Sequence, residues 1–325
     1  MRRWLFPWIA MVVAACSGGC AARRPALLPP GRPFLRVNET TNRVVSLEVA
    51  VRTFARTNRP GPPVRLVGVT HLGDAGYYAG LQRLLDAQPL VLFEGIGAGD
   101  KRFMAPHGDA YSLQPALARA LGLKFQLETI DYRGSNFVNS DLTLAQLRRV
   151  LESGPSPDDG QLGDLMSLMD GSSWAGVFVR FGLGFIESNP KLRATVRLAM
   201  IETLGAVDID LGDAKALPAE LRRLMEALIA ERNKAVVEDL RRVVDGRWRP
   251  AVGQGATGTG IAVFYGAGHM ADLERRLARD LGYGPVAEEW RPAFSVDPAA
   301  VGLSEAEVRF ARGLVREQLK AINGR

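Results

Sequence analysis

The apolar positions of this chain recur in short strand-like runs, and helical spacing follows several of them. Residues 43–54 alternate between apolar and polar side chains, which is the period of a half-buried strand. Shorter continuous apolar runs are typical of buried strands. Together the patterns predict further strands at residues 64–67, 89–93, 124–130 and 261–265, and helices at about 74–87, 114–121, 272–281 and 304–322.

Helical spacing also dominates the long stretch from about residue 141 to residue 246, with a break expected at Pro190, which cannot continue a helix. The predicted order is therefore β-α-β-α-β, a helical insert, and then β-α-α. Ser304 and Glu307 have the spacing of a capping box at the start of the last helix. This order favours an α/β (α+β) fold, with a mixed or parallel central sheet flanked by helices. We expect a single domain over residues 41–325 that carries the insert.

The first forty residues predict an exported, lipid-anchored protein. Two arginines precede an apolar stretch that ends at Ala15, which has the size and charge order of a secretory signal. The small residues before Cys16 resemble a bacterial lipobox, and Ser17 does not resemble an inner-membrane retention signal. We expect a signal peptide at 1–15, a lipid on Cys16, a tether at 16–40, and the periplasmic face of a bacterial outer membrane. The alternative is an ordinary cleaved signal with incidental cysteines.

Charge and cysteine content exclude two classes of site from the folded body. The net charge is +6, but the basic residues are spread over predicted helices and form no stripe interleaved with aromatic side chains. Nucleic acid is therefore not an expected partner. The two cysteines, Cys16 and Cys20, both lie in the leader region. The body consequently has no disulfide and no cysteine metal site.

Two of the three histidines end the same pattern, Gly-x-x-His, directly after a predicted strand. The copies are Gly68 to His71 and Gly266 to His269. Ligands of open α/β sheets bind at the carboxyl ends of strands, and a neutral imidazole is both a general base and a metal ligand. We expect the glycines to let the chain turn sharply and both histidines to share one site. The alternative is that each imidazole satisfies a buried backbone carbonyl.

Glu94 follows an apolar strand, where a charge is costly unless it is paired or functional. If this strand neighbours the Gly68 strand, Glu94 and His71 project at the same edge. The carboxylate could then bind a metal, orient a histidine or take a proton from water. The alternative role is a salt bridge, for which Arg232 is the candidate partner.

Other polar residues are candidates for supporting roles. Arg232 lies within a predicted helix, where it could stabilise an oxyanion, hold Glu94 or simply face solvent, and Asn233 beside it is a mediocre helix former. Asp131 ends a predicted strand, and Asp141 is expected to cap a helix that starts between residues 139 and 141. His107 lies in a polar loop and is expected at the surface.

The order of these motifs resembles the TraB/GumN (PrgY, TIKI) family over residues 43–290. The matching segments are Gly68 to His71, Leu92-Phe93-Glu94, Glu231-Arg232-Asn233, Gly266 to His269 and Leu281-Gly282-Tyr283. The chain departs from the family at Val236, where a methionine is frequent, and in a short segment between His269 and Gly282. The family is grouped with erythromycin esterase and with the haem-binding lipoprotein ChaN.

The resemblance implies a lipid-anchored hydrolase that cleaves an amide or ester bond of a peptide or small-molecule substrate. It assigns catalytic roles to His71, Glu94, Arg232 and His269. It also implies a divalent metal (manganese, cobalt or zinc) on His71, Glu94 and His269, although the esterase members use histidine without an obligatory metal. Two alternatives stay open: a haem- or metal-binding lipoprotein without turnover, and a non-catalytic inhibitory or peptide-capture module.

Overall fold

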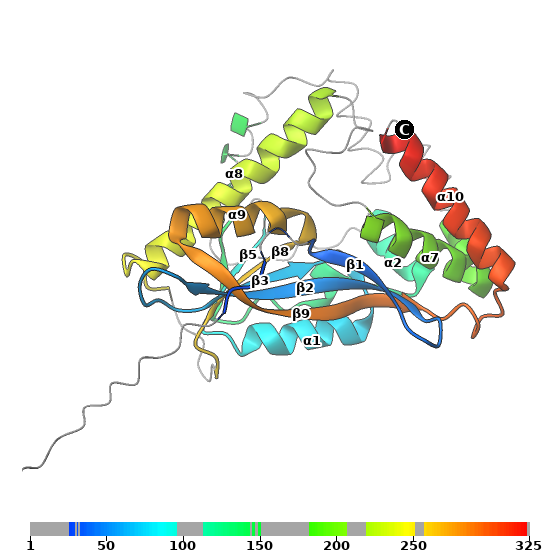
Figure 1. Ribbon diagram of the computed structural model, residues 1–325, viewed down its shortest axis with the longest axis horizontal. Helices are drawn as coiled ribbons and strands as arrows, with labels where there is room; N and C mark the ends of the chain where they lie inside the picture. The colour runs from blue at the N-terminus through cyan, green and yellow to red at the C-terminus, as the bar shows by residue number, and fades with distance from the viewer. Residues whose placement is uncertain are drawn as a thin grey trace, which may run out of the picture.

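The structure is a computed structural model, and it confirms the α/β fold class, with a mixed central sheet flanked by helices (Figure 1). The predicted lipidation site Cys16 and the loop residue His107 lie outside the described residues. In the part of the chain that the structure describes, no helix has both the length and the apolar character needed to cross a membrane. The structure describes residues 26–29, 31, 33–95, 113–143, 145–146, 149–150, 182–206, 219–250 and 257–323.

The described strands form one large sheet, in the order β1-β2-β3-β8-β5-β7, and β9 pairs with the other edge of β2. The half that contains β3, β8, β5 and β7 is parallel, whereas the pairings of β2 are antiparallel. Two short strands, β4 (Leu72–Gly73) and β6 (Lys124–Phe125), pair separately. The large sheet consists of β1 (Leu35–Glu39), β2 (Val45–Arg56), β3 (Val64–Val69), β5 (Leu90–Phe93), β7 (Phe137–Asn139), β8 (Ile261–Gly266) and β9 (Tyr283–Val296).

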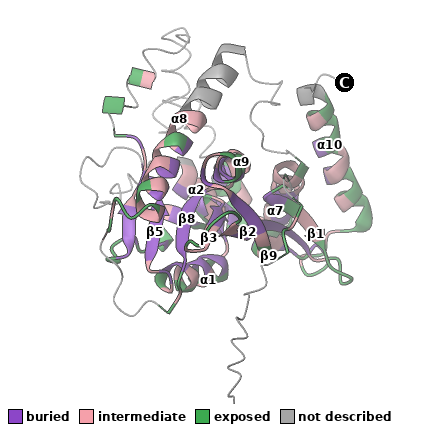
Figure 2. Cartoon of the chain, turned by 60° about the vertical axis from the view of Figure 1, so that its left-hand side comes forward, coloured by how far each residue is buried: buried purple, intermediate pink, exposed green. Residues whose placement is uncertain are grey.

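Helices cover both faces of the sheet, so that its strands are largely buried (Figures 1 and 2). One apolar core lies between the sheet and helices α8 and α9, and the other lies between the sheet and α1, α2 and α7. Helix α10 packs on α7. The helices are α1 (Ala75–Asp86), α2 (Leu113–Leu121), α3 (Gln126–Thr129), α7 (Pro190–Ala206), α8 (Ala219–Val244), α9 (Met270–Leu281) and α10 (Glu305–Asn323).

Two predicted helix boundaries are confirmed by their hydrogen bonds. Pro190 is the first residue of α7, and the side chain of Asn189 caps that helix by accepting a bond from the backbone N–H of Leu192 (3.0 Å). Proline is tolerated there because the first N–H groups of a helix have no partner within it. At α10, Ser304 and Glu307 exchange the two bonds of the expected capping box.

Three local predictions between residues 16 and 141 are wrong. Residues 35–39, expected in the tether, form β1, because Phe34 and Leu35 are apolar and become buried against β2. The strand expected at 124–130 is limited to β6, and helix α3 follows it. Residues 137–139 form strand β7, which was not expected, and the helix start expected at residues 139–141 lies further on, at Thr143. Short apolar runs do not distinguish a strand from a helix by period alone.

Strand β9 was also not expected, and its two prolines explain why. Pro285 and Pro292 lie within a strand that pairs with the whole of β2, although proline cannot donate to a ladder. The ladder shifts register beside each proline, between Leu47 and Glu48 and between residues 53 and 54. Such bulges release one residue from pairing, so the strand continues past both prolines.

Candidate functional site

Three neighbouring parallel strands bring the predicted site residues to one edge of the sheet. His71 follows β3, Glu94 follows β5, and His269 ends a 3₁₀ turn (Ala267–His269) directly after β8. Because β8 lies between β3 and β5, the strand of Glu94 does not neighbour the strand of Gly68. The topology therefore places Glu94 next to His269, and not next to His71 as the sequence suggested.

Three groups surround the carboxylate of Glu94. Its Oε2 accepts a hydrogen bond from the backbone N–H of Gly266 (2.7 Å). Its Oε1 lies 2.7 Å from Nη2 of Arg232 and 3.6 Å from Nε2 of His269. The side chains of Glu94 and His269 retain 17% and 8% of their exposure, so the pair is shielded but is not sealed from solvent.

The two motif glycines permit close packing and not the sharp turn that was expected. A Cβ on Gly266 would lie 3.3 Å from Oε2 of Glu94, and Gly266 itself has a negative φ of −52°. Gly68 lies within β3, where a Cβ would lie 3.0 Å from the side chain of Val49 on β2. Glycine at these positions lets the carboxylate approach one strand end and lets two strands approach each other.

Arg232 is bound by a second carboxylate, which belongs to Asp141. Nε and Nη2 of Arg232 lie 3.0 and 2.6 Å from the two oxygens of Asp141, which is a bidentate pair. The Asp141 side chain is fully buried and also accepts bonds from the backbone N–H groups of Gly95 (3.0 Å) and Leu142 (2.7 Å). Asp141 thus belongs to the ion-pair network of Glu94 and Arg232.

Asp141 was expected to cap a helix, but Thr143 makes the capping hydrogen bonds instead. Thr143 and Gln146 exchange side-chain-to-backbone hydrogen bonds in the manner of a capping box. Asp141 is instead drawn to the guanidinium, because a buried carboxylate gains more from a charged partner than from a helix end. Nothing in the sequence near residue 141 indicates this, since its partner is 91 positions away.

The network keeps Glu94 ionised. Burial would raise the pKa of Glu94, but the interaction with His269, the charge of Arg232 and the N–H of Gly266 together lower it well below its usual range. Burial would likewise lower the pKa of Arg232, but Asp141 and Glu94 raise it. One guanidinium therefore faces two carboxylates, and the cluster retains one net negative charge beside His269.

Asn233, the neighbour of Arg232 on α8, holds the other side of His269. Its Oδ1 lies 2.8 Å from Nδ1 of His269. Its Nδ2 donates to the backbone carbonyl of His269 (3.2 Å) and to Asp272 (2.9 Å). The ring of Tyr265 meets the imidazole edge-on, with 5.3 Å between centroids. Consecutive residues of one helix thus bind both members of the Glu94–His269 pair.

His71 is exposed and is held by a residue that the sequence analysis missed. Its Nδ1 lies 3.0 Å from Oε1 of Gln126, whose Nε2 donates to the hydroxyl of Tyr132 (2.9 Å). Gln126 stands in the segment that was predicted as a strand, so no signal placed it beside His71. Asp131 is exposed, and its carboxylate pairs with Arg133.

The three metal ligands implied by the family resemblance do not come together. Within the described residues, no three histidine, cysteine, aspartate or glutamate side chains are grouped so that they could hold a metal ion. Both oxygens of Glu94 already accept hydrogen bonds from protein donors, and Nδ1 of each histidine faces an amide oxygen. Nε2 of each histidine stays available, so the misfit lies in the bound oxygens of Glu94 and in the lack of a grouped ligand set among the described residues, and the metal stays a prediction of the resemblance.

Two remaining motif positions have structural roles. Gly282 ends α9 in the left-handed conformation (φ +69°), which favours glycine. Val236, where the family frequently has methionine, is buried in the core between α8 and the sheet. The departure at Val236 therefore concerns packing in this core.

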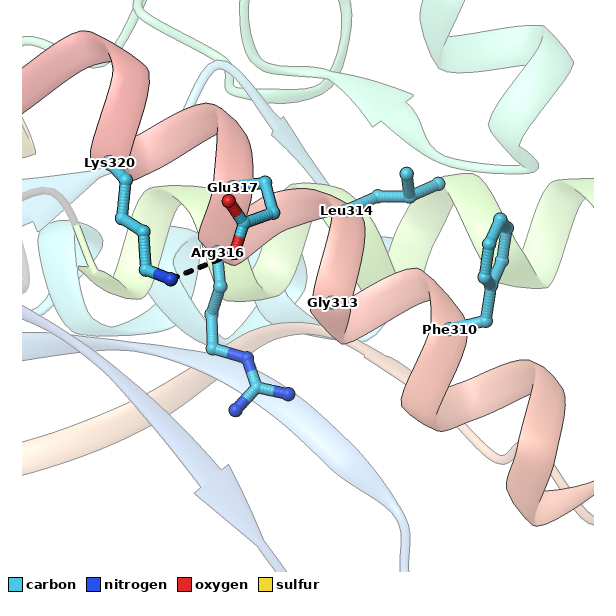
Figure 3. Close-up of a pocket in the computed structure, with 6 residues that line it drawn as sticks. All are labelled: Phe310, Gly313, Leu314, Arg316, Glu317 and Lys320. Carbon is cyan, nitrogen blue, oxygen red and sulfur yellow. Dashed lines mark hydrogen bonds and ion pairs between the residues drawn. The ribbon is translucent and has the colours of Figure 1, made fainter.

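The hollow shown in Figure 3 is separate from this edge of the sheet. It lies on one helix, α10, and carries the exposed apolar side chains of Phe310 and Leu314. Glu317 and Lys320 form an ion pair with each other at its other end (Figure 3). No predicted site residue lines the hollow, so the cluster at the ends of β5 and β8 is the candidate site.

Comparisons of the chain with protein-family models, with curated proteins and with solved structures find no match.

Proposed function

We propose that this protein is a hydrolase that cleaves an amide or ester bond, with His269 as general base and Glu94 as its charged partner. The observation that carries the proposal is the distance of 3.6 Å between Nε2 of His269 and Oε1 of Glu94. This distance is too long for a direct hydrogen bond, but one water molecule can donate to both atoms. The motif resemblance to the TraB/GumN family supports the same class of reaction.

The reaction starts when the oxygen of this water attacks the carbonyl carbon of the substrate. The water proton passes to Nε2 of His269, and the carbonyl electron pair becomes an oxyanion. The net negative charge of Glu94, Arg232 and Asp141 stabilises the imidazolium that forms. The carbon–nitrogen or carbon–oxygen bond then breaks, and the proton on Nε2 passes to the leaving group.

Arg232 and His71 have secondary roles in this proposal. Nε and Nη2 of Arg232 bind Asp141 and Glu94, and Nη1 takes part in none of these bonds. We assign Nη1 as the donor to the oxyanion, while the rest of the guanidinium holds Glu94 in place. His71 is exposed one strand away from His269, and we assign it to contact with the substrate or leaving group.

The test compares Glu94→Gln and His269→Gln with the control Asp131→Asn on libraries of fluorogenic esters and peptides. General-base catalysis contributes roughly 10² to 10⁴ in rate, so kcat/KM should fall at least about 100-fold in both site variants. Asp131 is a strand-end acid paired with Arg133 at the surface, and its replacement should leave kcat/KM unchanged. Thermal unfolding curves confirm that each variant is folded. Unchanged turnover in either site variant would overturn the proposal.

The metal-dependent form of the reaction has its own measurement. The purified protein is analysed for manganese, cobalt and zinc, and activity is measured after chelation and after each metal is restored. A stoichiometric metal that is lost in His71→Ala would favour the metal-dependent mechanism. Activity that persists without metal would favour the histidine mechanism above. Haem or metal binding without any turnover would favour the binding-protein alternative.

The leader supports a further proposal, that Cys16 carries a lipid which anchors the protein to the periplasmic face of a bacterial outer membrane. Intact-mass analysis and palmitate labelling of the expressed protein test it. The expected result is a lipid on the wild-type chain that is absent from Cys16→Ser, with Cys20→Ser as the matched control. An unlipidated wild-type protein would indicate an ordinary cleaved signal.

A further inference from the structure

We propose that Asn233 is a positioning residue that holds neutral His269 in the tautomer with hydrogen on Nδ1, so that Nε2 presents a lone pair towards Glu94. We assign the same role for His71 to Gln126. The catalytic meaning of this arrangement rests on the proposed function, whereas the tautomers themselves are independent of it.

The orientation of the Asn233 amide follows from the two acceptors that surround it. Nδ2 faces the backbone carbonyl oxygen of His269 at 3.2 Å and a carboxylate oxygen of Asp272 at 2.9 Å. A carbonyl oxygen cannot donate, and Asp272 is also bound by Arg276 at 2.5 Å. Burial would raise the pKa of Asp272, but hydrogen bonds from Arg276 and Asn233 and the charge of Arg276 lower it, so this carboxylate is ionised. A flipped amide would place its oxygen against two acceptors.

The fixed amide determines where His269 carries its hydrogen. With Nδ2 committed to the two acceptors, the atom of Asn233 that faces His269 is Oδ1, at 2.8 Å from Nδ1. Oδ1 can only accept, so Nδ1 must donate, and neutral His269 has no hydrogen on Nε2. The opposite tautomer would direct an N–H towards the carboxylate of Glu94 and would leave no lone pair to accept a proton from water.

The burial of Asn233 makes this constraint strong. The Asn233 side chain has no exposure, so water cannot replace a lost partner, and an unpaired amide group would be costly there. Its bonds join α8 to the turn that carries His269 and to the first turn of α9. This explains why a mediocre helix former occupies the interior of a 26-residue helix.

Gln126 repeats the arrangement at His71 from a different element. Its Nε2 donates to the Tyr132 hydroxyl at 2.9 Å, and its Oε1 lies 3.0 Å from Nδ1 of His71. Its backbone N–H donates to the carbonyl oxygen of His71 at 2.9 Å. Both imidazoles are therefore held through Nδ1 by a side-chain amide, and both leave Nε2 for a proton or a substrate.

The experiment measures the tautomers directly, by long-range proton–nitrogen NMR of the ¹⁵N-histidine-labelled full chain. The chain has only three histidines, so His71→Gln and His269→Gln assign the signals. At a pH where the rings are neutral, we expect hydrogen on Nδ1 for both. Asn233→Leu should move His269, and not His71, towards the Nε2–H tautomer and lower kcat/KM at least about tenfold. Gln126→Leu should move only His71.

A matched control and a conservative variant separate positioning from folding. Asn136 is a buried asparagine whose side chain donates to the carbonyl oxygens of Leu85 (3.0 Å) and Gln88 (2.9 Å). Asn136→Leu should destabilise the fold and leave both tautomers unchanged. Asn233→Asp keeps an oxygen that faces Nδ1 of His269, so the Nδ1–H tautomer should be kept in this conservative variant.

The outcomes for the tautomers and for the proposed function are distinguishable. Hydrogen on Nε2 of His269 in the wild-type protein, or an unchanged tautomer in folded Asn233→Leu, would overturn the inference whatever the activity. If the tautomers respond as expected but no substrate is cleaved by the wild-type protein, the inference stands and the proposed hydrolase function fails.

Discussion

Replacing Arg232 by methionine removes the guanidinium that lies between Asp141 and Glu94 while keeping much of the apolar stem. The Asp141 side chain has no exposure, and that of Glu94 has 17%. Breaking a buried ion pair by removing one partner costs about 3–5 kcal/mol of the free energy of unfolding. Asp141 retains backbone N–H bonds from Gly95 and Leu142, so we expect a loss near the lower limit, about 3 kcal/mol.

The pH dependence of this loss follows from the sign of the pKa shift. The pKa of Glu94 in the folded protein is lowered, because His269, Arg232 and Gly266 outweigh the effect of burial. Its contribution to stability is therefore present above the ordinary glutamate pKa of about 4.3 and is lost as the pH falls through the folded value. Without Arg232, burial favours the protonated carboxyls. The variant should consequently lose most stability at neutral pH and recover part of it towards pH 5.

Urea unfolding followed by circular dichroism at pH 7 and pH 5 measures both effects. The double variant Arg232→Met with Asp141→Asn should regain part of the lost stability, because it removes the buried charge that was left unpaired but keeps an acceptor for only one of the two backbone N–H groups. Arg133→Met removes an exposed arginine paired with Asp131 and should leave the unfolding midpoint unchanged. A loss below about 1 kcal/mol, or one equal at both pH values, would refute the reasoning about buried charge.

Four further substitutions test the site, the core and a helix end. Gly266→Ala places a Cβ 3.3 Å from the Glu94 carboxylate, so activity should fall while the unfolding midpoint changes little; unchanged kinetics would contradict this. Leu198→Ala in the buried face of α7 should cost about 2–5 kcal/mol in urea unfolding, and a smaller cost would indicate loose packing. Ser304→Ala removes the α10 cap and should cost about 0.5–2 kcal/mol, whereas Glu307→Gln should cost less.

The strands β2, β3, β5 and β8 and the helices α1, α2, α9 and α10 lie close to the ranges predicted from the sequence. Hydrophobic period, capping residues and the break at Pro190 are short-range features, so they can be recognised without a partner. They also placed His71, Glu94 and His269 at strand ends. By contrast, strand β9 escaped prediction because it contains Pro285 and Pro292, which a strand tolerates at an edge or at a bulge, and only the pairing with β2 supplies these settings.

The sequence by itself determined which side chains stand at strand ends, whereas the tertiary structure decided which of them meet. Strand order depends on packing between segments far apart in the chain, and no local pattern records it. The insertion of β8 between β3 and β5 joins Glu94 to His269 and separates it from His71. In the same way, only the folded chain pairs Asp141 with Arg232, because a buried charge is stabilised by whatever opposite charge the fold brings to it.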